Sequence, residues 1–307
     1  MSIWVCGEVL IDALPGQSLL GGGPANTAIA LANLGEKVEF IGVISSDEYG
    51  DMARGEFERH GVAISHVFES PKPTAMAKVS VDEGGVASYL FTIGGTATFD
   101  FGEGWLPNPS RTTPALLHIG SLAAIVEPGA QAVYEWAMRI AEFAPVVYDP
   151  NIRPAYLSDR NRYLETVENW ISISSVVKAS DDDLTWLYPE TDLIEIAKNW
   201  LAIGAHLVVI TKGAQGLMAV TSEEVIDVPG ISVPVVDTVG AGDTVGAVIS
   251  KAVVDYGLVN MRGKVLREAL NCAGLAAAIT CSRVGMQPPT KSELEARRNE
   301  HKNAVHR

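Results

Sequence analysis

The stretch Asp-Thr-Val-Gly-Ala-Gly-Asp at residues 237–243 follows a strand-like run at 233–236 and opens an apolar helical pattern over 244–256. Glycines at such a turn let the backbone approach a ligand closely, and the first N–H groups of a helix have no partner within the helix. These groups form a ready site for an anion such as phosphate. An aspartate beside that site can accept the proton of a hydroxyl that attacks phosphorus, so Asp243 is a candidate general base.

The glycine-rich turn also has a purely structural interpretation. Taken alone, it could be a strand-to-helix connection in which the aspartate only stabilises the helix N-terminus. It is not a dinucleotide fingerprint, because Val245 stands where the last glycine of Gly-x-Gly-x-x-Gly is required. Residues 257–264 are not a P-loop either, because five residues separate the glycines and Val265 replaces the required Ser or Thr.

Around this turn, short apolar runs alternate with helical patterns along the chain. This alternation predicts an α/β fold with three layers, α/β/α, and a mostly parallel central sheet. Two runs at 75–81 and 87–91, joined by Asp-Glu-Gly-Gly at 82–85, break the alternation and predict a hairpin. The predicted strands are 3–5, 38–44, 116–119, 146–148, 175–178 and 207–211, and the predicted helices are 26–34, 49–60, 129–143, 160–172, 193–203, 244–256, 265–281 and a charged tail at 291–307.

Composition limits the classes of function. The 307 residues, treated as one domain, carry 23 Lys and Arg against 37 Asp and Glu, a net charge of −14, which disfavours nucleic acid or anionic membrane as a partner. Cys6, Cys272 and Cys281 show no Cys-x-x-Cys spacing and are expected to be buried thiols in a reducing compartment. Without a basic leader or a run of about 18 apolar residues, the protein is expected to be cytoplasmic.

A second glycine cluster, Gly-Gly-Gly-Pro-Ala-Asn at residues 21–26, precedes the first predicted helix. Its backbone can approach a polar ligand, and the amide of Asn26 can both donate to and accept from hydroxyls. Asp12 ends the strand-like run 8–11, a position where α/β proteins usually hold ligand groups. A loop at 13–20 then keeps Asp12 near the glycine cluster.

Taken together, Gly-Glu-Val-Leu-Ile-Asp at 7–12, the cluster at 21–26 and the turn at 237–243 resemble the ribokinase-like, phosphofructokinase-B family of carbohydrate kinases. Asp-Pro-Asn-Ile-Arg at 149–153 and Thr-Lys-Gly-Ala-Gln-Gly at 211–216 match two further family segments in the right order. The resemblance implies the predicted three-layer fold with a small β lid over the sugar. That lid would consist mainly of residues 72–93, with a contribution from 13–20.

The resemblance also implies roles for individual residues, with ATP and Mg²⁺ as cofactors. The base would be Asp243, and Arg153 would neutralise charge near the phosphates, although a surface salt bridge is its alternative role. The anion hole for the phosphoryl group would consist of the N–H groups of Gly240, Ala241 and Gly242. The sugar would contact Asp12, Gly22, Gly23 and Asn26, and the nucleotide would contact Thr211, Gly213, Gly216 and, at the adenine, Asn271.

Three segments depart from the family pattern. Ser-Asp-Asp-Asp at 180–183 replaces the usual Asn-x-x-Glu, so Asp183 would act on Mg²⁺ with a shorter carboxylate, through water. Val-Gly-Met at 284–286 replaces Gly-Ala near the adenine and the monovalent-cation loop, which leaves K⁺ dependence open. The short linker at 13–20 would remove one strand from the lid, so a homodimer paired through the lid also stays open.

The segments at 7–12 and 149–153 look most like the fructokinase branch, so conversion of D-fructose to fructose 6-phosphate is the first choice. Relatives that act on 2-keto-3-deoxygluconate have a Tyr-Arg pair where Thr92 and Ile93 stand here, which weighs against that acid sugar. The same residues also depart from many fructokinases, which have an arginine there too. Other neutral sugars and nucleosides stay open, as does a non-catalytic sugar- or nucleotide-binding regulator, against which Asp243 argues. His118 is interpreted as a packed core residue in preference to a substrate contact.

Overall fold

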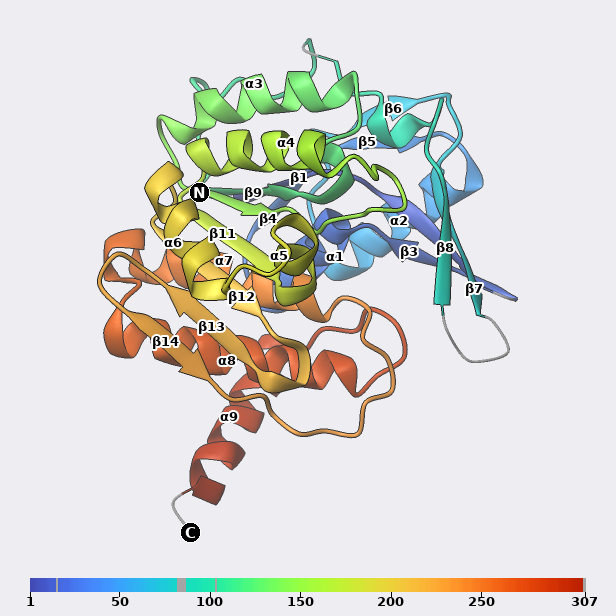
Figure 1. Cartoon of the computed structure of the whole chain (residues 1–307). Coiled ribbons are helices and arrows are strands. Elements are labelled where there is room, and N and C mark those ends of the chain that lie inside the picture. The colour runs from blue at the N-terminus through green and yellow to red at the C-terminus, as the bar shows by residue number, and fades with distance from the viewer. Residues whose placement is uncertain (15, 82–86, 103, 306–307) are drawn as a thin grey trace.

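The computed structural model describes residues 1–14, 16–81, 87–102 and 104–305 (Figure 1). Its central sheet has the strand order β14-β13-β12-β11-β10-β9-β1-β4. The strands from β4 to β12 pair in parallel, and β13 and β14 continue the sheet in antiparallel pairing. The bounds are β1 Ile3–Cys6, β4 Val38–Ile41, β9 Leu116–Gly120, β10 Val146–Asp149, β11 Val176–Ser180, β12 Leu207–Thr211, β13 Leu217–Val220 and β14 Val225–Val228.

Helices cover both faces of this sheet, which confirms the predicted three-layer α/β/α class (Figure 1). Because successive strand residues point to opposite faces, Trp4 packs with one layer of helices and Val5 with the other. The first layer holds α3 Gly129–Ala141, α4 Arg160–Ile173, α5 Asp181–Leu187 and α6 Leu193–Ile203. The second holds α1 Gly23–Asn33, α2 Glu48–His60, α7 Ala241–Tyr256, α8 Gly263–Cys281 and α9 Lys291–Val305.

A smaller sheet has the order β3-β2-β7-β8 and contains the segments predicted to form the lid, so it is called the lid below. The predicted hairpin is present as β7 Ala75–Val81 and β8 Ala87–Thr92, and it projects from the body of the molecule (Figure 1). The connection predicted at 82–85 lies outside the described residues. The other half of the lid is a hairpin of β2 Leu10–Leu14 and β3 Gln17–Gly21, so Asp12 lies in the middle of a strand and the segment 13–20 is not a plain loop.

Two local predictions about strands differ from the structure. Residues 38–44 form β4 and then a separate β5, Val43–Ser45, which pairs with β6, Phe68–Ser70. The break falls at Gly42, where a β-carbon would lie 2.5 Å from Cε1 of Phe40. Residues 233–236 are an irregular segment instead of a strand, because Pro234 has no N–H to donate to a neighbouring strand. Val235 is 65% exposed and packs into neither core.

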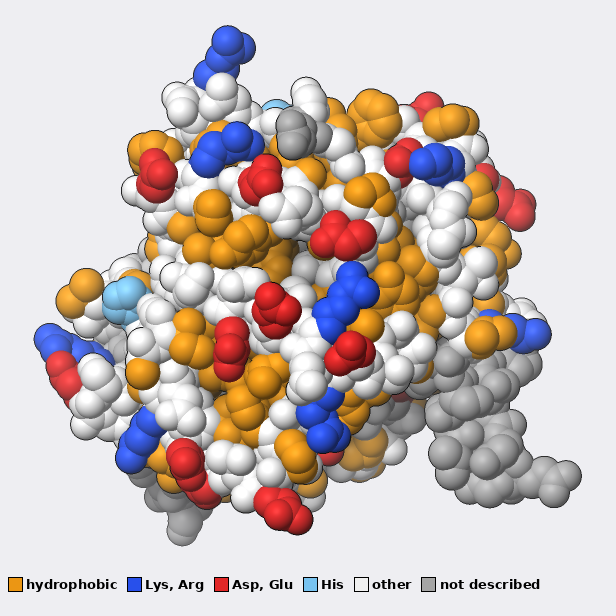
Figure 2. Space-filling model, turned by 45° about the horizontal axis from the view of Figure 1, so that its top comes forward, with side chains coloured by type: hydrophobic (Ala, Val, Ile, Leu, Met, Phe, Trp, Pro, Cys, Tyr) orange, Lys and Arg blue, Asp and Glu red, His pale blue; other side chains and the backbone are white. Residues whose placement is uncertain are grey.

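The helix that follows this segment begins earlier than predicted. α7 starts at Ala241, with Gly240 as its N-cap at a φ of 76°, so Gly242 and Asp243 lie in the first turn. Among the helices of the described ranges, none is long and apolar enough to cross a membrane. On the face drawn in Figure 2, acidic and basic side chains are interspersed. The net charge of −14 is therefore not gathered into one uniformly acidic field on that face.

Candidate active site

A cavity of about 680 Å³ lies where the carboxyl ends of the parallel strands meet the N-termini of α1 and α7. Strands β1, β9 and β10 deliver Glu8, Ser121 and Asn151 to it, because each of these residues follows the end of its strand. The lid supplies the opposite wall with Leu10, Ala77 and Phe91. The remaining lining residues are Asp12, Gly22, Gly23, Asn26, Leu122, Arg153, Pro154, Ala155, Lys178, Asp182, Thr238, Val239, Gly240, Gly242 and Asp243.

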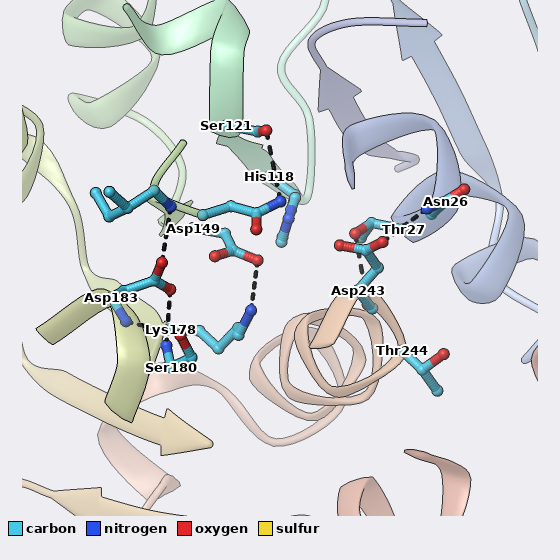
Figure 3. A network of polar contacts seen from close by, with 12 residues as sticks. Asn26, Thr27, His118, Ser121, Asp149, Lys178, Ser180, Asp183, Asp243 and Thr244 are labelled. Atoms are coloured by element: carbon cyan, nitrogen blue, oxygen red, sulfur yellow. Dashed lines mark hydrogen bonds and ion pairs between the residues drawn. The ribbon is translucent and has the colours of Figure 1, made fainter. Parts of the chain in front are cut away.

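Asp243 is buried and lines this cavity, and its side chain points toward Asn26 (Figure 3). Its Oδ2 accepts a hydrogen bond of 2.8 Å from Nδ2 of Asn26. Burial raises the pKa of Asp243 to about 6, and the carboxylate of Asp149 adds to this, whereas Lys178, Asn26 and Arg153 act in the opposite direction. A carboxylate with a pKa close to neutral is suited to take a proton from a hydroxyl and to release it again.

The predicted anion hole lies at the start of α7, in the same cavity. Ala241 donates a long bond of 3.3 Å to the carbonyl of Thr238, which precedes the helix, and in the described ranges the N–H groups of Gly242 and Asp243 have no backbone partner. The left-handed φ of Gly240 turns the chain into the helix at this point. The arrangement leaves partial positive charge next to Asp243, where an anion would be stabilised.

The four residues predicted to hold the sugar all line the cavity. Oδ1 of Asn26 is a buried acceptor that has no hydrogen-bond partner within the described part of the chain. Gly22 has a φ of 105°, and a β-carbon there would lie 2.6 Å from the carbonyl oxygen of Glu8. A β-carbon at Gly23 would lie 2.9 Å from Nδ2 of Asn151. The glycines therefore bring the backbone close to the polar groups around a ligand.

Asp12 projects from lid strand β2 into the same cavity. Burial raises its pKa to about 6; the charge of Arg153 lowers the pKa and that of Asp237 raises it. A β-carbon at Gly21 would lie 2.4 Å from Oδ2 of Asp12, so this close approach requires glycine. Asp12 is thus placed where closure of the lid would bring it onto a ligand.

Arg153 lies in the cavity and does not form the surface salt bridge that was its alternative role. Its Nη1 donates to the carbonyl of Ile152 at 3.0 Å, and in the described ranges it takes part in no ion pair. Its charge lowers the pKa of both Asp12 and Asp243. An unpaired guanidinium next to the anion hole can neutralise charge on a phosphoryl group.

Asp183, the predicted metal residue, has both carboxylate oxygens engaged (Figure 3). Oδ1 accepts from the N–H of Ile152 at 2.8 Å, and Oδ2 accepts from the N–H of Ser180 at 3.0 Å, which completes a capping box on α5. The described residues contain no cluster of three metal-ligating side chains. Such a site fits Mg²⁺ carried mainly by nucleotide phosphates and water, and the role of Asp183 in holding it stays a prediction.

The predicted nucleotide residues lie beside this site but not in the cavity. Thr211 ends β12 in register with Ser180 of β11, and Gly213 and Gly216 follow it. At Gly216 the φ is 105° and a β-carbon would lie 2.1 Å from the carbonyl oxygen of Val228. Close packing of the backbone therefore already requires glycine at this position. Asn271 is an exposed residue of α8. Nucleotide contacts of these four residues stay predictions.

Met286 packs against the start of α7. Its sulfur would lie 2.0 Å from a β-carbon at Gly240, so the methionine lies directly behind the glycine of the N-cap. Met286 also lines a second cavity of about 780 Å³, which adjoins the first and shares Asp12, Asn26 and Val239 with it. The segment 284–286, which departs from the family pattern, therefore lies against the predicted anion hole at the start of α7. Its predicted effects on adenine binding and on a K⁺ loop stay predictions.

Sequence reasoning missed a buried ion pair between Lys178 and Asp149 (Figure 3). Nζ of Lys178 lies 2.7 Å from Oδ2 of Asp149, and each residue is 4% exposed. The signal was a lysine inside the apolar run Val-Val-Lys-Ala at 176–179. His118 is buried under α7, where Nδ1 lies 3.1 Å from Oγ of Ser250, and burial lowers its pKa to about 3, as the core interpretation predicts.

Comparisons with known proteins find similar fructokinases. A fructokinase from Rhizobium leguminosarum bv. trifolii is 36% identical over 254 residues, which cover 80% of this chain and 77% of the relative. Probable fructokinase-4 from Arabidopsis thaliana is 32% identical over 310 residues, covering 94% of each chain. The crystal structure of a fructokinase with bound ATP from Xylella fastidiosa has a TM-score of 0.86 at 25% identity, covering 98% of this chain and 99% of that chain.

A second solved structure is similar to the same extent. It is a fructokinase double mutant from Vibrio cholerae O395 with fructose, ADP and potassium ion bound, with a TM-score of 0.86 at 25% identity over 96% of this chain and 98% of that chain. The sequence pattern of the pfkB family carbohydrate kinases matches residues 15–293. The chain therefore belongs to the pfkB family of carbohydrate kinases.

Proposed function

We propose that this chain transfers the γ-phosphate of ATP to a hydroxyl of D-fructose and forms fructose 6-phosphate. The observation that carries the proposal is the pair of Asn26 and Asp243 beside the N-terminus of α7, in a cavity closed on one side by the lid. The substrate is argued from relatives that are named fructokinases and from the polarity of the cavity. ATP as the donor is supported by the similar fructokinase structure that holds it.

In the proposed reaction, the sugar hydroxyl approaches Asp243 and is oriented by Oδ1 of Asn26, the buried acceptor that lacks a partner in the described ranges. The hydroxyl oxygen forms a bond to the γ-phosphorus while its proton passes to the Asp243 carboxylate. The bond from phosphorus to the β,γ-bridging oxygen breaks, and its electron pair leaves with ADP. The N–H groups of α7 and the guanidinium of Arg153 stabilise the negative charge on the phosphoryl oxygens.

A divalent cation on the nucleotide phosphates neutralises part of their charge when it is bound. The chain would position this ion through water, with Asp183 close to the segment 149–153 that it anchors. That arrangement is consistent with the capping role of Asp183, because a carboxylate oxygen has more than one lone pair and can also accept from water.

The charge in the cavity favours a neutral sugar over a sugar acid. The acidic residues Glu8, Asp12, Asp182 and Asp243 line the cavity with two cations, Arg153 and Lys178, of which Lys178 is paired with Asp149. Oε2 of Glu8 accepts from the N–H of Ala123 at 3.0 Å. A substrate carboxylate would be repelled by those acidic groups that are ionised, whereas sugar hydroxyls can donate hydrogen bonds to them.

The lid contributes apolar surface that would exclude water from the site. Leu10, Ala77 and Phe91 of its strands face the cavity with this surface. Closure over the sugar would remove bulk water from the phosphoryl group and limit hydrolysis of ATP.

The test is ADP release from Mg-ATP with fructose, ribose, 2-keto-3-deoxygluconate, tagatose 6-phosphate or adenosine as acceptor. We expect turnover with fructose that Asp243→Asn abolishes and that Asp255→Asn, the same change at the far end of α7, leaves intact. Turnover with another acceptor would keep the mechanism and refute fructose. No turnover with any acceptor, despite binding of fructose and ATP, would support a non-catalytic regulator. Replacing KCl by NaCl in the assay tests dependence on K⁺.

A further inference from the structure

The side chain of Lys178 lies on the face of the sheet that packs under α1, α7 and α8. Its neighbours on that face are mostly apolar and include Val147, Val176 and Val209, with the neutral, buried imidazole of His118 nearby. Burying an ion pair in such surroundings removes both charges from water, a cost that the attraction between them often does not offset. The pair of Lys178 and Asp149 is therefore not explained by a gain in stability, since an apolar pair would fill the same space at lower cost.

The helix above this lysine is shaped to admit it. A β-carbon at Gly242 would lie 3.1 Å from Nζ of Lys178, which is a tight contact. One helical turn later, a β-carbon at Gly246 would lie 3.1 Å from Cε1 of His118 and in ordinary contact, 3.9 Å, with Cδ of Lys178. The absence of a side chain at Gly242 therefore lets the ammonium group approach the first turn of α7.

The ammonium group carries its charge at this position. Burial alone would lower the pKa of Lys178, but the carboxylate of Asp149 more than offsets this and raises the pKa. Of its three N–H donors, the hydrogen bonds in the described ranges use one, to Oδ2 of Asp149 at 2.7 Å. Lys178 also lines the cavity together with Gly242 and Asp243. Donors are therefore left for an anion held at the N-terminus of α7.

We propose that Lys178 is a further catalytic residue, whose ammonium group donates a hydrogen bond to an oxygen of the phosphoryl group during transfer, and that Asp149 is the residue that positions it. This inference rests on the proposed kinase function. In the step described above, no proton leaves Lys178. Its fixed positive charge offsets the negative charge on the oxygens while the new oxygen–phosphorus bond forms and the bond to ADP breaks.

The test must separate this role from a purely structural ion pair. Lys178→Met leaves the Asp149 carboxylate buried without a partner and can impair folding for that reason alone. The double variant Lys178→Met/Asp149→Asn removes both charges and keeps the shape of the two side chains. Its turnover therefore decides between a catalytic and a purely structural role. Lys251→Met is the matched control, because Lys251 forms an ion pair with Glu36 on the outer side of α7.

We expect the double variant to fold and to lose at least about a hundredfold in kcat, the scale of removing one donor to a developing charge. Asp149→Asn alone keeps the ammonium group and is expected to lose less, and Lys251→Met should keep wild-type turnover. If the folded double variant keeps kcat within about threefold of the wild type, the electrostatic role of Lys178 is refuted and the pair is structural.

A binding measurement distinguishes failure of this inference from failure of the proposed function. The melting temperature is measured with fructose and MgADP, with and without aluminium fluoride. Aluminium fluoride bound next to ADP imitates the phosphoryl group during transfer. We expect aluminium fluoride to raise the melting temperature of the wild type and of Lys251→Met, but not of the double variant. Equal, nonzero increments in all proteins would overturn the role of Lys178. A wild type with no increment and no turnover on any sugar refutes the proposed function, and the inference about Lys178, which rests on it, falls with it.

Discussion

Nδ2 of Asn26 donates a hydrogen bond of 2.8 Å to Oδ2 of Asp243, although 217 positions separate the two residues. Asn26 lies in the first turns of α1 and Asp243 in the first turn of α7, and these helices pack side by side. One amide thus orients the carboxylate that is the candidate base, while its own Oδ1 stays available to a ligand. The proposed base and a sugar-binding residue are held as one unit.

Asn26→Ala should shift the pH dependence of turnover. The hydrogen bond from Asn26 lowers the pKa of Asp243, so its loss should raise that pKa and move the acidic limb of the kcat profile to higher pH. The KM for the sugar should rise as well, because the buried acceptor is removed. The profile is measured between pH 5 and 9, and an acidic limb at the wild-type position would contradict the orienting role of Asn26.

For the wild type, the expected acidic limb lies near pH 6. The base must be ionised, and the pKa of Asp243 is raised to about 6 by burial, so turnover should fall as the pH is lowered through this value. A limb near pH 4, where an exposed aspartate titrates, would show that Asp243 is not the group that controls the rate.

Asp243→Asn should be more stable than the wild type at pH 8, although it is expected to lose at least about a hundredfold in turnover. The raised pKa means that the folded protein loses stability, relative to the unfolded chain, as the pH rises through 4 to 6. Asparagine does not ionise, so the free energy of unfolding of Asp243→Asn should exceed that of the wild type by up to about 3 kcal/mol above pH 6. This difference should vanish near pH 4. Urea unfolding at pH 4 and pH 8 measures it, and an equal difference at both pH values would count against the burial argument.

Asp12→Ala should act mainly on the sugar. Loss of a hydroxyl contact in a buried site costs ~1–3 kcal/mol, so the KM for fructose should rise by about 5- to 150-fold, while the KM for ATP stays within about twofold. Steady-state kinetics with each substrate varied in turn measures both constants. A fructose KM that does not change would remove Asp12 from the sugar site.

Asp183→Ala should lower stability, because it removes the acceptors of the N–H groups of Ile152 and Ser180. The N-cap of α5 is Ser180, whose hydroxyl keeps its own bond to the N–H of residue 183. Loss of a hydrogen bond to a charged acceptor costs ~1.5–3 kcal/mol, which thermal unfolding would detect. The Mg²⁺ concentration for half-maximal turnover tests the proposed metal role separately. A rise in that concentration supports the metal role. An unchanged concentration with a lower melting temperature would mean that Asp183 only stabilises the start of α5 and the segment at Ile152.

Much of this architecture could be predicted from local patterns. The runs at 116–119 and 207–211 are strands because several apolar and β-branched residues follow one another, as in strands buried on both faces. The turn at 237–243 indicated Asp243 as a candidate base and a helix after the turn, because glycine and aspartate have strong local preferences, although the helix begins at Ala241, before the predicted residue 244. The lid hairpin β2–β3 was not predicted, since Gln-Ser-Leu-Leu-Gly at 17–21 has no alternation of apolar and polar residues.

The sequence by itself determined the three-layer class, the glycine-rich turn that carries the candidate base and the resemblance to carbohydrate kinases, because each depends on residues that are neighbours along the chain. Only the tertiary structure decided that Asn26 donates to Asp243, that Arg153 is free of ion pairs in the described ranges, and that Lys178 reaches the start of α7. These facts depend on how separate strands and helices pack. Strand register and helix packing bring such side chains to within a few ångströms of one another, and no local pattern encodes that distance.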